Sequence, residues 1–157
     1  MNFLEQLLSE WYEYKGYFVK TNIRIQKRKT GGYKGEMDVI AYEPKRKELI
    51  HIEVSGDAGS WDDRKKRIVK KFKTAEKSYK DIFPFEYSKR EQIVIVGISR
   101  PRKKVDFGSN IIIKSFKEQL GEIYHELEET NPNQKAVPEK YPIIRAIQCT
   151  IWFRPKD

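Results

Sequence analysis

The sequence predicts an α/β protein with a mixed central β-sheet flanked by helices, in the order helix, three strands, helix, strand. Three observations support this class: a helical pattern opens the chain, short strand-like segments follow it, and a long amphipathic pattern precedes a nearly unbroken apolar run. A chain of 157 residues is about the size of one domain. We therefore expect a single domain over 1–157, with a core at about 1–100 and a C-terminal extension of helix and strand at about 109–157.

The first half of the chain predicts one helix and three strands. Leucines and a tryptophan recur at helical spacing until a glycine, and apolar residues then alternate with charged ones. A glycine pair and a proline mark the turns between the strands. The predicted elements are a helix over 3–15 and strands over 17–26, 37–42 and 48–54.

The second half predicts a long helix over 61–81, with Ser60 as its N-cap, and a strand buried on both faces over 92–99. The pattern weakens after that strand. A short strand over 110–114 and an amphipathic helix over 115–129 are expected. The segment 142–153 fits neither period cleanly, and we favour a helix there.

The formal net charge of +9 comes from clustered basic residues, at 24–34, 64–80 and 100–104. Such clusters attract polyanions, although solvated helix faces would also account for them. No apolar run is long enough to cross a bilayer, and the start of the chain lacks the features of a signal peptide, so a cytoplasmic protein that does not enter membranes is expected. With one cysteine and two histidines, a zinc site would lack its usual ligands, so any bound metal needs oxygen ligands.

Two acidic residues interrupt apolar strands, where an unpaired carboxylate is costly. Asp38 is expected near the start of the second strand and Glu53 near the end of the third. Antiparallel pairing would bring both carboxylates to one end of the sheet, where they would repel each other unless a cation lay between them. Mg²⁺ or Mn²⁺ would suit this geometry and would activate a water for attack on a phosphodiester. Structural ion pairs are the alternative interpretation.

An N-terminal helix carrying Glu5, a Gly-Tyr pair, the segment GEMDVIA and a strand containing HIEV follow in this order. This pattern resembles the PD-(D/E)xK nuclease superfamily, particularly its small members related to Holliday-junction resolvases and Mrr-like restriction nucleases. The resemblance covers about half of the chain. It implies a restriction-endonuclease-like αβββαβ core, Asp38 and Glu53 as metal ligands, and Glu5 as an assisting catalytic residue, for which Glu10 is the alternative.

The chain departs from the superfamily at Ser55, where the motif has a lysine that stabilises charge in the transition state. A serine cannot supply this cation. The helix predicted over 61–81 offers several basic residues, and we favour Lys71 as the displaced catalytic lysine because it lies beside the apolar stripe. Asp57 is a candidate third acid, and His51 shares the strand face of Glu53. The expected nucleic-acid contacts are Arg28, Lys29, Lys34, Arg64, Lys66, Arg67, Arg102 and Lys103.

Three functions remain open on this reasoning. The favoured one is a Mg²⁺-dependent (or Mn²⁺-dependent) endonuclease that hydrolyses DNA. The second is a catalytically inactive nuclease-fold module that binds nucleic acid or assembles with a partner, which Ser55 supports. The third is a basic α/β interaction protein whose acids form structural ion pairs. The sequence does not separate DNA from RNA as the ligand, and a homodimer would suit cleavage of both strands.

Overall fold

The structure is a computed structural model that describes residues 2–56, 60–97, 106–108 and 110–154. One five-stranded sheet, with strand order β1-β2-β3-β4-β5, organises the chain. Strands β1 (Phe18–Lys27), β2 (Tyr33–Glu43) and β3 (Glu48–Ser55) pair in antiparallel fashion, whereas β4 (Lys89–Val96) and β5 (Ile111–Ser115) are added in parallel. The sheet is therefore mixed.

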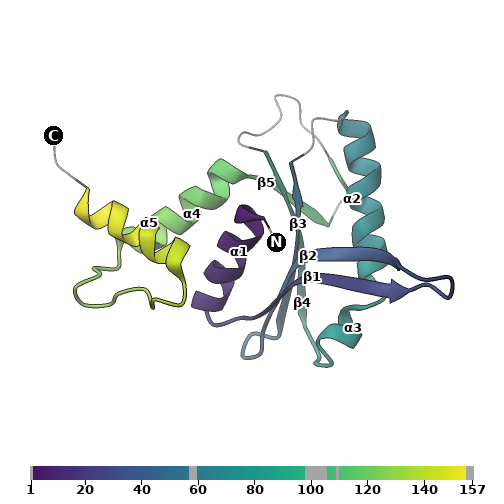
Figure 1. The fold of residues 1–157 in the computed structure, drawn as a ribbon, viewed down its shortest axis with the longest axis horizontal. Helices are drawn as coiled ribbons and strands as arrows, with labels where there is room; N and C mark the ends of the chain where they lie inside the picture. The colour runs from purple at the N-terminus through teal and green to yellow at the C-terminus, as the bar shows by residue number, and fades with distance from the viewer. Residues whose placement is uncertain (1, 57–59, 98–105, 109, 155–157) are drawn as a thin grey trace.

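Helices cover both faces of this sheet (Figure 1). The helices α1 (Phe3–Tyr14), α4 (Phe116–Glu128) and α5 (Pro142–Phe153) pack with one face around a core that includes Leu8, Ile52 and Ile123. The helices α2 (Trp61–Glu76) and α3 (Tyr79–Ile82) cover the other face. Helix α5 contributes Ile144 to the same core as α1 and packs against α1 and α4.

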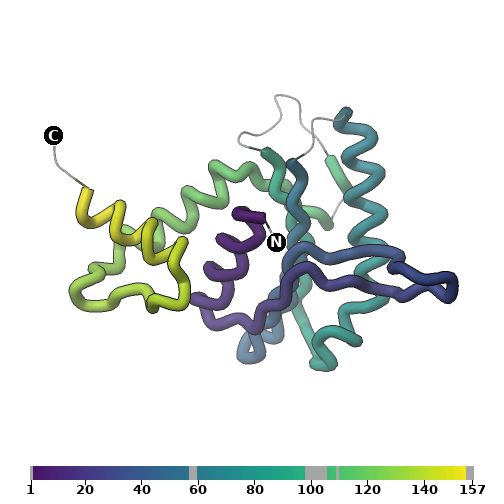
Figure 2. The backbone as a smooth tube through the Cα atoms, viewed as in Figure 1, coloured from purple at the N-terminus to yellow at the C-terminus, as the bar shows by residue number. Residues whose placement is uncertain are grey.

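The sheet forks between β2 and β3. Their ladder ends at the pair Val39 and Ile52, after which β2 continues with β1 alone and β3 continues with β4 alone. The β1–β2 hairpin beyond this point, residues 22–37, passes α2, and its tip projects beyond that helix (Figure 2); this hairpin is called the arm below. Such a fork leaves two strand ends without a shared ladder, and polar side chains must then satisfy the freed backbone groups.

The α/β class, the mixed sheet and the order αβββαβ are confirmed. The segment 142–153 is a helix, as favoured, and Ser60 caps α2 by accepting the N–H of Asp63. No helix in the described part of the chain is long and apolar enough to cross a membrane.

Three predicted boundaries are wrong, and one of them is the start of β4, which lies at Lys89 rather than at residue 92. Strand β2 begins at Tyr33 rather than at residue 37, because its pairing with β1 extends through polar residues that hydropathy does not mark. Asp38 therefore lies in the middle of its strand, not near its start. The predicted helix over 61–81 is two helices, since α2 ends at Glu76 and the fully buried Tyr79 opens α3.

Candidate active site at the fork of the sheet

The two acids singled out by the sequence meet at the fork. Asp38 on β2 accepts the backbone N–H of Val54 through Oδ2 at 2.8 Å, so its side chain bonds the β3 backbone just beyond the end of the β2–β3 ladder. Glu53 precedes Val54 and is 1% exposed, so both carboxylates are held by the sheet rather than by solvent. Rigid strands are the supports that a precise site needs.

The backbone is irregular at this point. Between the pairs Thr21–Val39 and Ile23–Met37, Asn22 has a φ of 51°, a left-handed conformation that non-glycine residues rarely adopt. Met37 and Val39 pack in different core clusters, so the pleat changes face at Asp38. Irregularities of this kind are concentrated at functional sites, where they redirect a side chain.

Lys71 of α2 completes the site. Its ammonium lies 3.2 Å from Oδ1 of Asp38 and also pairs with Oε2 of Glu53. The Lys71 side chain is one-third exposed, whereas the two carboxylates beneath it are buried. The helix therefore delivers a cation to both acids, at the residue that the sequence pattern favours for the displaced lysine.

The pKa values of this trio reflect burial and mutual charge. Burial raises the pKa of Asp38, and the neighbouring Glu53 acts in the same direction, against the Val54 N–H and Lys71. Burial also raises the pKa of Glu53, against the influence of Lys71. Burial lowers the pKa of Lys71, but the two carboxylates outweigh it and the pKa stands above its ordinary value. The site thus holds two acids that favour a cation close to them.

The residues present fit a divalent cation. The Lys71 ammonium contacts one oxygen of each carboxylate, which demonstrates that a single cation can reach both acids. Mg²⁺ is commonly held by one or two carboxylates with water in its other positions. Within the described part of the chain, no three of the residue types His, Cys, Asp and Glu form a metal-binding group. The candidate third acid, Asp57, lies outside the described residues.

Ser55, where the resembling superfamily has its lysine, is buried two residues beyond Glu53 on the same strand. Its hydroxyl oxygen has no hydrogen-bond partner among the described residues. A buried hydroxyl without a hydrogen bond costs free energy of desolvation, so replacing Ser55 would break no side-chain hydrogen bond among the described residues.

The two first-helix glutamates have separate environments. Glu5 accepts a hydrogen bond from Asn22 at 2.9 Å and forms a capping box with Asn2, which places it near the fork without a direct bond to Asp38. Glu10 accepts the N–H groups of Ile143 and Ile144 at the first turn of α5. Glu10 therefore caps a helix, and Glu5 stays the candidate assisting residue.

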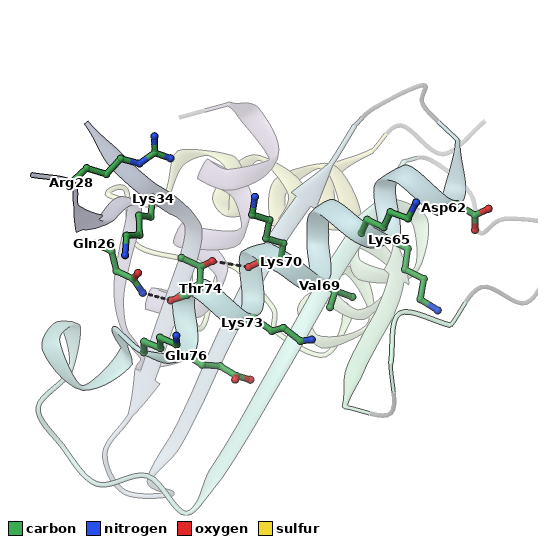
Figure 3. A pocket seen from close by; sticks show the side chains of 12 residues that line it. Gln26, Arg28, Lys34, Asp62, Lys65, Val69, Lys70, Lys73, Thr74 and Glu76 are labelled. Carbon is green, nitrogen blue, oxygen red and sulfur yellow. Dashed lines mark hydrogen bonds between the residues drawn. The ribbon is translucent and has the colours of Figure 1, made fainter. Parts of the chain in front are cut away.

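A basic groove lies between the arm and the exposed side of α2 (Figure 3). It encloses about 1180 Å³. Gln26 of the arm donates to the carbonyl of Thr74 at 2.8 Å and so ties the two walls together. Seven basic side chains line the groove, against the acids Asp62 and Glu76. These basic residues are Arg28, Lys34, Lys65, Lys66, Lys70, Lys73 and Lys77.

The expected nucleic-acid contacts divide between several environments. Arg28, Lys34 and Lys66 line the groove, whereas Lys29 and Arg67 are exposed outside its lining. Arg64 differs from the others, because it is buried and its guanidinium carbon lies 4.4 Å from the centroid of the Trp61 ring, which leaves it less available to a nucleic acid. Helical periodicity alone does not separate a stacked arginine from a solvated one. Arg102 and Lys103 lie outside the described residues.

The first prediction from this geometry concerns stability. The pKa of Asp38 is higher in the folded protein than in the unfolded chain. Asp38 therefore makes its full contribution to the free energy of unfolding at pH values below its pKa in the unfolded chain, and this contribution is lost as pH rises through its pKa in the folded protein. Asn does not titrate and can still accept the Val54 N–H. We expect Asp38→Asn to raise the melting temperature at pH 8 by about 2 to 4 °C. The difference in melting temperature between variant and wild type should become smaller at acidic pH, and thermal unfolding over a pH series measures it.

Glu43, at the far end of the same strand, is the control of opposite sign. The Arg46 backbone N–H lowers its pKa, so Glu43 adds stability above its unfolded pKa and loses it as pH falls. Glu43→Gln should therefore lower the melting temperature at pH 8. A lower melting temperature for Asp38→Asn as well would mean that the pair with Lys71 is a net stabilising ion pair.

Comparison with known proteins supports the fold but gives no information on the activity. No protein-family model matches the chain, and no curated protein matches it. The crystal structure of a protein of unknown function, AF1548, superposes with a TM-score of 0.52 at 12% sequence identity, over 95% of this chain and 96% of that chain. At this identity the likeness supports a common fold alone.

Proposed function

We propose that this protein is a Mg²⁺-dependent or Mn²⁺-dependent endonuclease that hydrolyses DNA phosphodiester bonds. The observation that carries the proposal is the contact of the Lys71 ammonium with both Asp38 and Glu53 at the fork of the sheet. An acid pair with a lysine is the combination that the resembling superfamily uses, and here the lysine comes from α2 instead of position 55.

Each residue of the site has a role in this proposal. Asp38 and Glu53 would hold the cation, with Asp38 oriented by the Val54 N–H. A bound Mg²⁺ would polarise a phosphoryl oxygen and lower the pKa of a water ligand. Lys71 would turn its ammonium to the phosphate and stabilise the charge that develops on its oxygens. The one-third exposure of the Lys71 side chain gives it access to a ligand outside the core.

The groove supports a nucleic acid as the substrate. Lys70 and Lys66, which line it, lie on the same helix as Lys71, so a bound backbone would pass close to the site. Its lining contains no aromatic side chain, among the described residues, on which a base would stack. Phosphate contacts are therefore expected to dominate, which favours duplex DNA bound through its backbone.

Removing lysines that line the groove should lower the affinity for DNA and should also reduce the dependence of that affinity on salt concentration. We expect Lys70→Ala combined with Lys73→Ala to reduce the slope of log K against log[salt] by about 0.9 for each phosphate that the variant no longer neutralises. Fluorescence anisotropy with a labelled duplex, over a salt series in Ca²⁺ or EDTA, measures this slope. Lys117→Ala, an exposed lysine on α4 across the sheet, is the matched control and should leave the slope unchanged.

The direct test is cleavage of supercoiled plasmid with Mg²⁺ and with Mn²⁺, using Asp38→Ala as the inactive control. Single-stranded and duplex RNA in the same assay separate DNA from RNA as the substrate. If cleavage of both plasmid strands rises with protein concentration in a second-order manner, a homodimer is the active form.

The alternative is an inactive nuclease-fold module that binds nucleic acid or assembles with a partner. The observation in its favour is that Lys71 already pairs with both acids while Ser55 leaves the motif position without a cation. DNA binding with no cleavage under either metal would select this alternative.

A further inference from the structure

A hydrogen-bonded chain of buried polar side chains leads to the site from the core. The Nε2 of Gln92 donates to the hydroxyl of Tyr79 at 3.1 Å, the hydroxyl lies 2.8 Å from Nδ1 of His51, and Nε2 of His51 lies 2.9 Å from Oε1 of Glu53. His51 and Tyr79 are 0% exposed and Gln92 is 4% exposed. These three residues are called the Gln92–Tyr79–His51 chain below.

The proton positions in this chain follow from its donors. Gln92 donates to the Tyr79 oxygen, which leaves the one Tyr79 proton for Nδ1 of His51. The His51 proton then lies on Nε2 and is donated to Glu53. The opposite tautomer would set a nitrogen lone pair against a buried carboxylate, which is repulsive.

The Gln92–Tyr79–His51 chain is costly as core structure. His51 packs edge-on against Phe72, with ring centroids 4.8 Å apart, in a region where an apolar residue would need no polar partner. A fully satisfied polar network in such a place fixes geometry, because no member can rotate without losing a bond in low dielectric. Among the described residues, the Gln92–Tyr79–His51 chain reaches the candidate site only through the hydrogen bond between His51 and Oε1 of Glu53.

We propose that His51, held by Tyr79 and Gln92, is a positioning residue that fixes the Glu53 carboxylate so that its Oε2 faces the cation position now contacted by Lys71. This inference rests on the proposed metal-dependent function. A hydrogen bond at Oε1 suits the role, because it holds one oxygen of the Glu53 carboxylate in place and leaves the other oxygen, Oε2, to face a cation. Partners of this kind typically contribute about 10- to 100-fold in metal affinity or activity.

The test compares variants by Mn²⁺ affinity, measured from the electron paramagnetic resonance signal of free Mn²⁺, without any cleavage step. We expect His51→Phe, which keeps the volume and loses the donor, to weaken Mn²⁺ binding by about 10- to 100-fold. His51→Gln can still place an N–H near Oε1 and should recover part of the affinity. Tyr79→Phe removes only the hydroxyl that sets the tautomer, and a smaller loss is expected.

Phe72→Leu is the matched control, since it disturbs the same contact with the His51 ring without touching a hydrogen bond. It should lower stability and leave Mn²⁺ affinity unchanged. Crystal structures of the metal-free His51→Phe and Phe72→Leu proteins give a second measurement. The Glu53 carboxylate should rotate in the first protein and stay in place in the second.

The outcomes separate this inference from the proposed function. Wild-type affinity for Mn²⁺ in His51→Phe, or an unmoved Glu53 in its crystal structure, overturns the positioning role alone. A wild-type protein that binds no Mn²⁺ overturns both proposals. Mn²⁺ binding that depends on His51 in a protein that never cleaves DNA supports the positioning role and overturns the nuclease.

Discussion

Asp38→Ala and Glu53→Ala should each abolish metal-dependent plasmid cleavage, by about 10³-fold or more, while DNA affinity stays close to that of the wild type. Both acids face the Lys71 ammonium in the buried fork, and neither lines the basic groove, so their loss should remove the proposed metal ligands and spare the proposed phosphate contacts. Single-turnover cleavage at saturating DNA measures the rate, and anisotropy in Ca²⁺ measures the affinity.

Matched variants make this expectation specific. Asp38→Asn keeps the shape and the bond to Val54 but loses the charge, and it should be as inactive as the alanine variant. Glu43→Gln alters another buried acid on the same strand and should cleave at the wild-type rate. Full activity in either Asp38→Ala or Glu53→Ala would rule out the nuclease proposal.

Lys71→Ala should lower the cleavage rate by about 10²-fold or more, the size of one preorganised electrostatic contact. Its effect on DNA affinity should be no larger than that of one phosphate contact. Lys71 also lowers the pKa of both acids, so its removal raises them further and weakens metal binding near neutral pH. The rate is therefore compared at pH 8.5 and saturating Mg²⁺, since high pH and a bound cation both favour the ionised carboxylates.

Ser55→Lys in the Lys71→Ala protein should restore part of the lost activity. Position 55 lies two residues beyond Glu53 on the same strand face, and the serine hydroxyl there makes no hydrogen bond among the described residues. A lysine from this position reaches the same acids from the strand instead of from the helix. The double variant needs the rate measurement alone, because its DNA contacts in the groove are unchanged.

A groove lysine behaves differently. Lys70→Ala should weaken binding and leave the saturated rate alone, and Ser55→Lys should not rescue it. A wild-type rate in Lys71→Ala would exclude the displaced lysine at that residue. A slow Lys71→Ala protein that Ser55→Lys fails to restore would show that the helix position itself is required.

Much of the fold follows from local patterns. The helix α1, the buried strand β4 and the Ser60 cap are each set by a short run of residues, and sequence periodicity captures such runs. The arm is different, because polar residues such as Lys34 and Glu36 enter β2 only through their pairing with β1. Its length depends on a partner strand, which hydropathy does not report.

The candidate site also has residues that the sequence predicts and residues that it does not. The placement of Asp38 and Glu53 in apolar strands, and of Lys71 beside the stripe of α2, is enough to predict that the three meet. The contributions of Tyr79 and Gln92 do not follow from the sequence, because their hydrogen bonds join α3 and β4 to β3 across long sequence separations. Whether a polar residue in an apolar run is buried against a partner depends on the tertiary fold.

The ion pairs of Lys71 also bear on how the chain folds in the absence of a bound divalent cation. Two buried carboxylates facing each other would normally need an external cation for the chain to fold around them. Lys71 is a counter-ion supplied by the chain itself, held in place by α2 and available at any concentration of divalent salt. Folding is thereby uncoupled from metal supply, so the protein should unfold at the same temperature in EDTA as in a dilute Mg²⁺ buffer that leaves the site unsaturated.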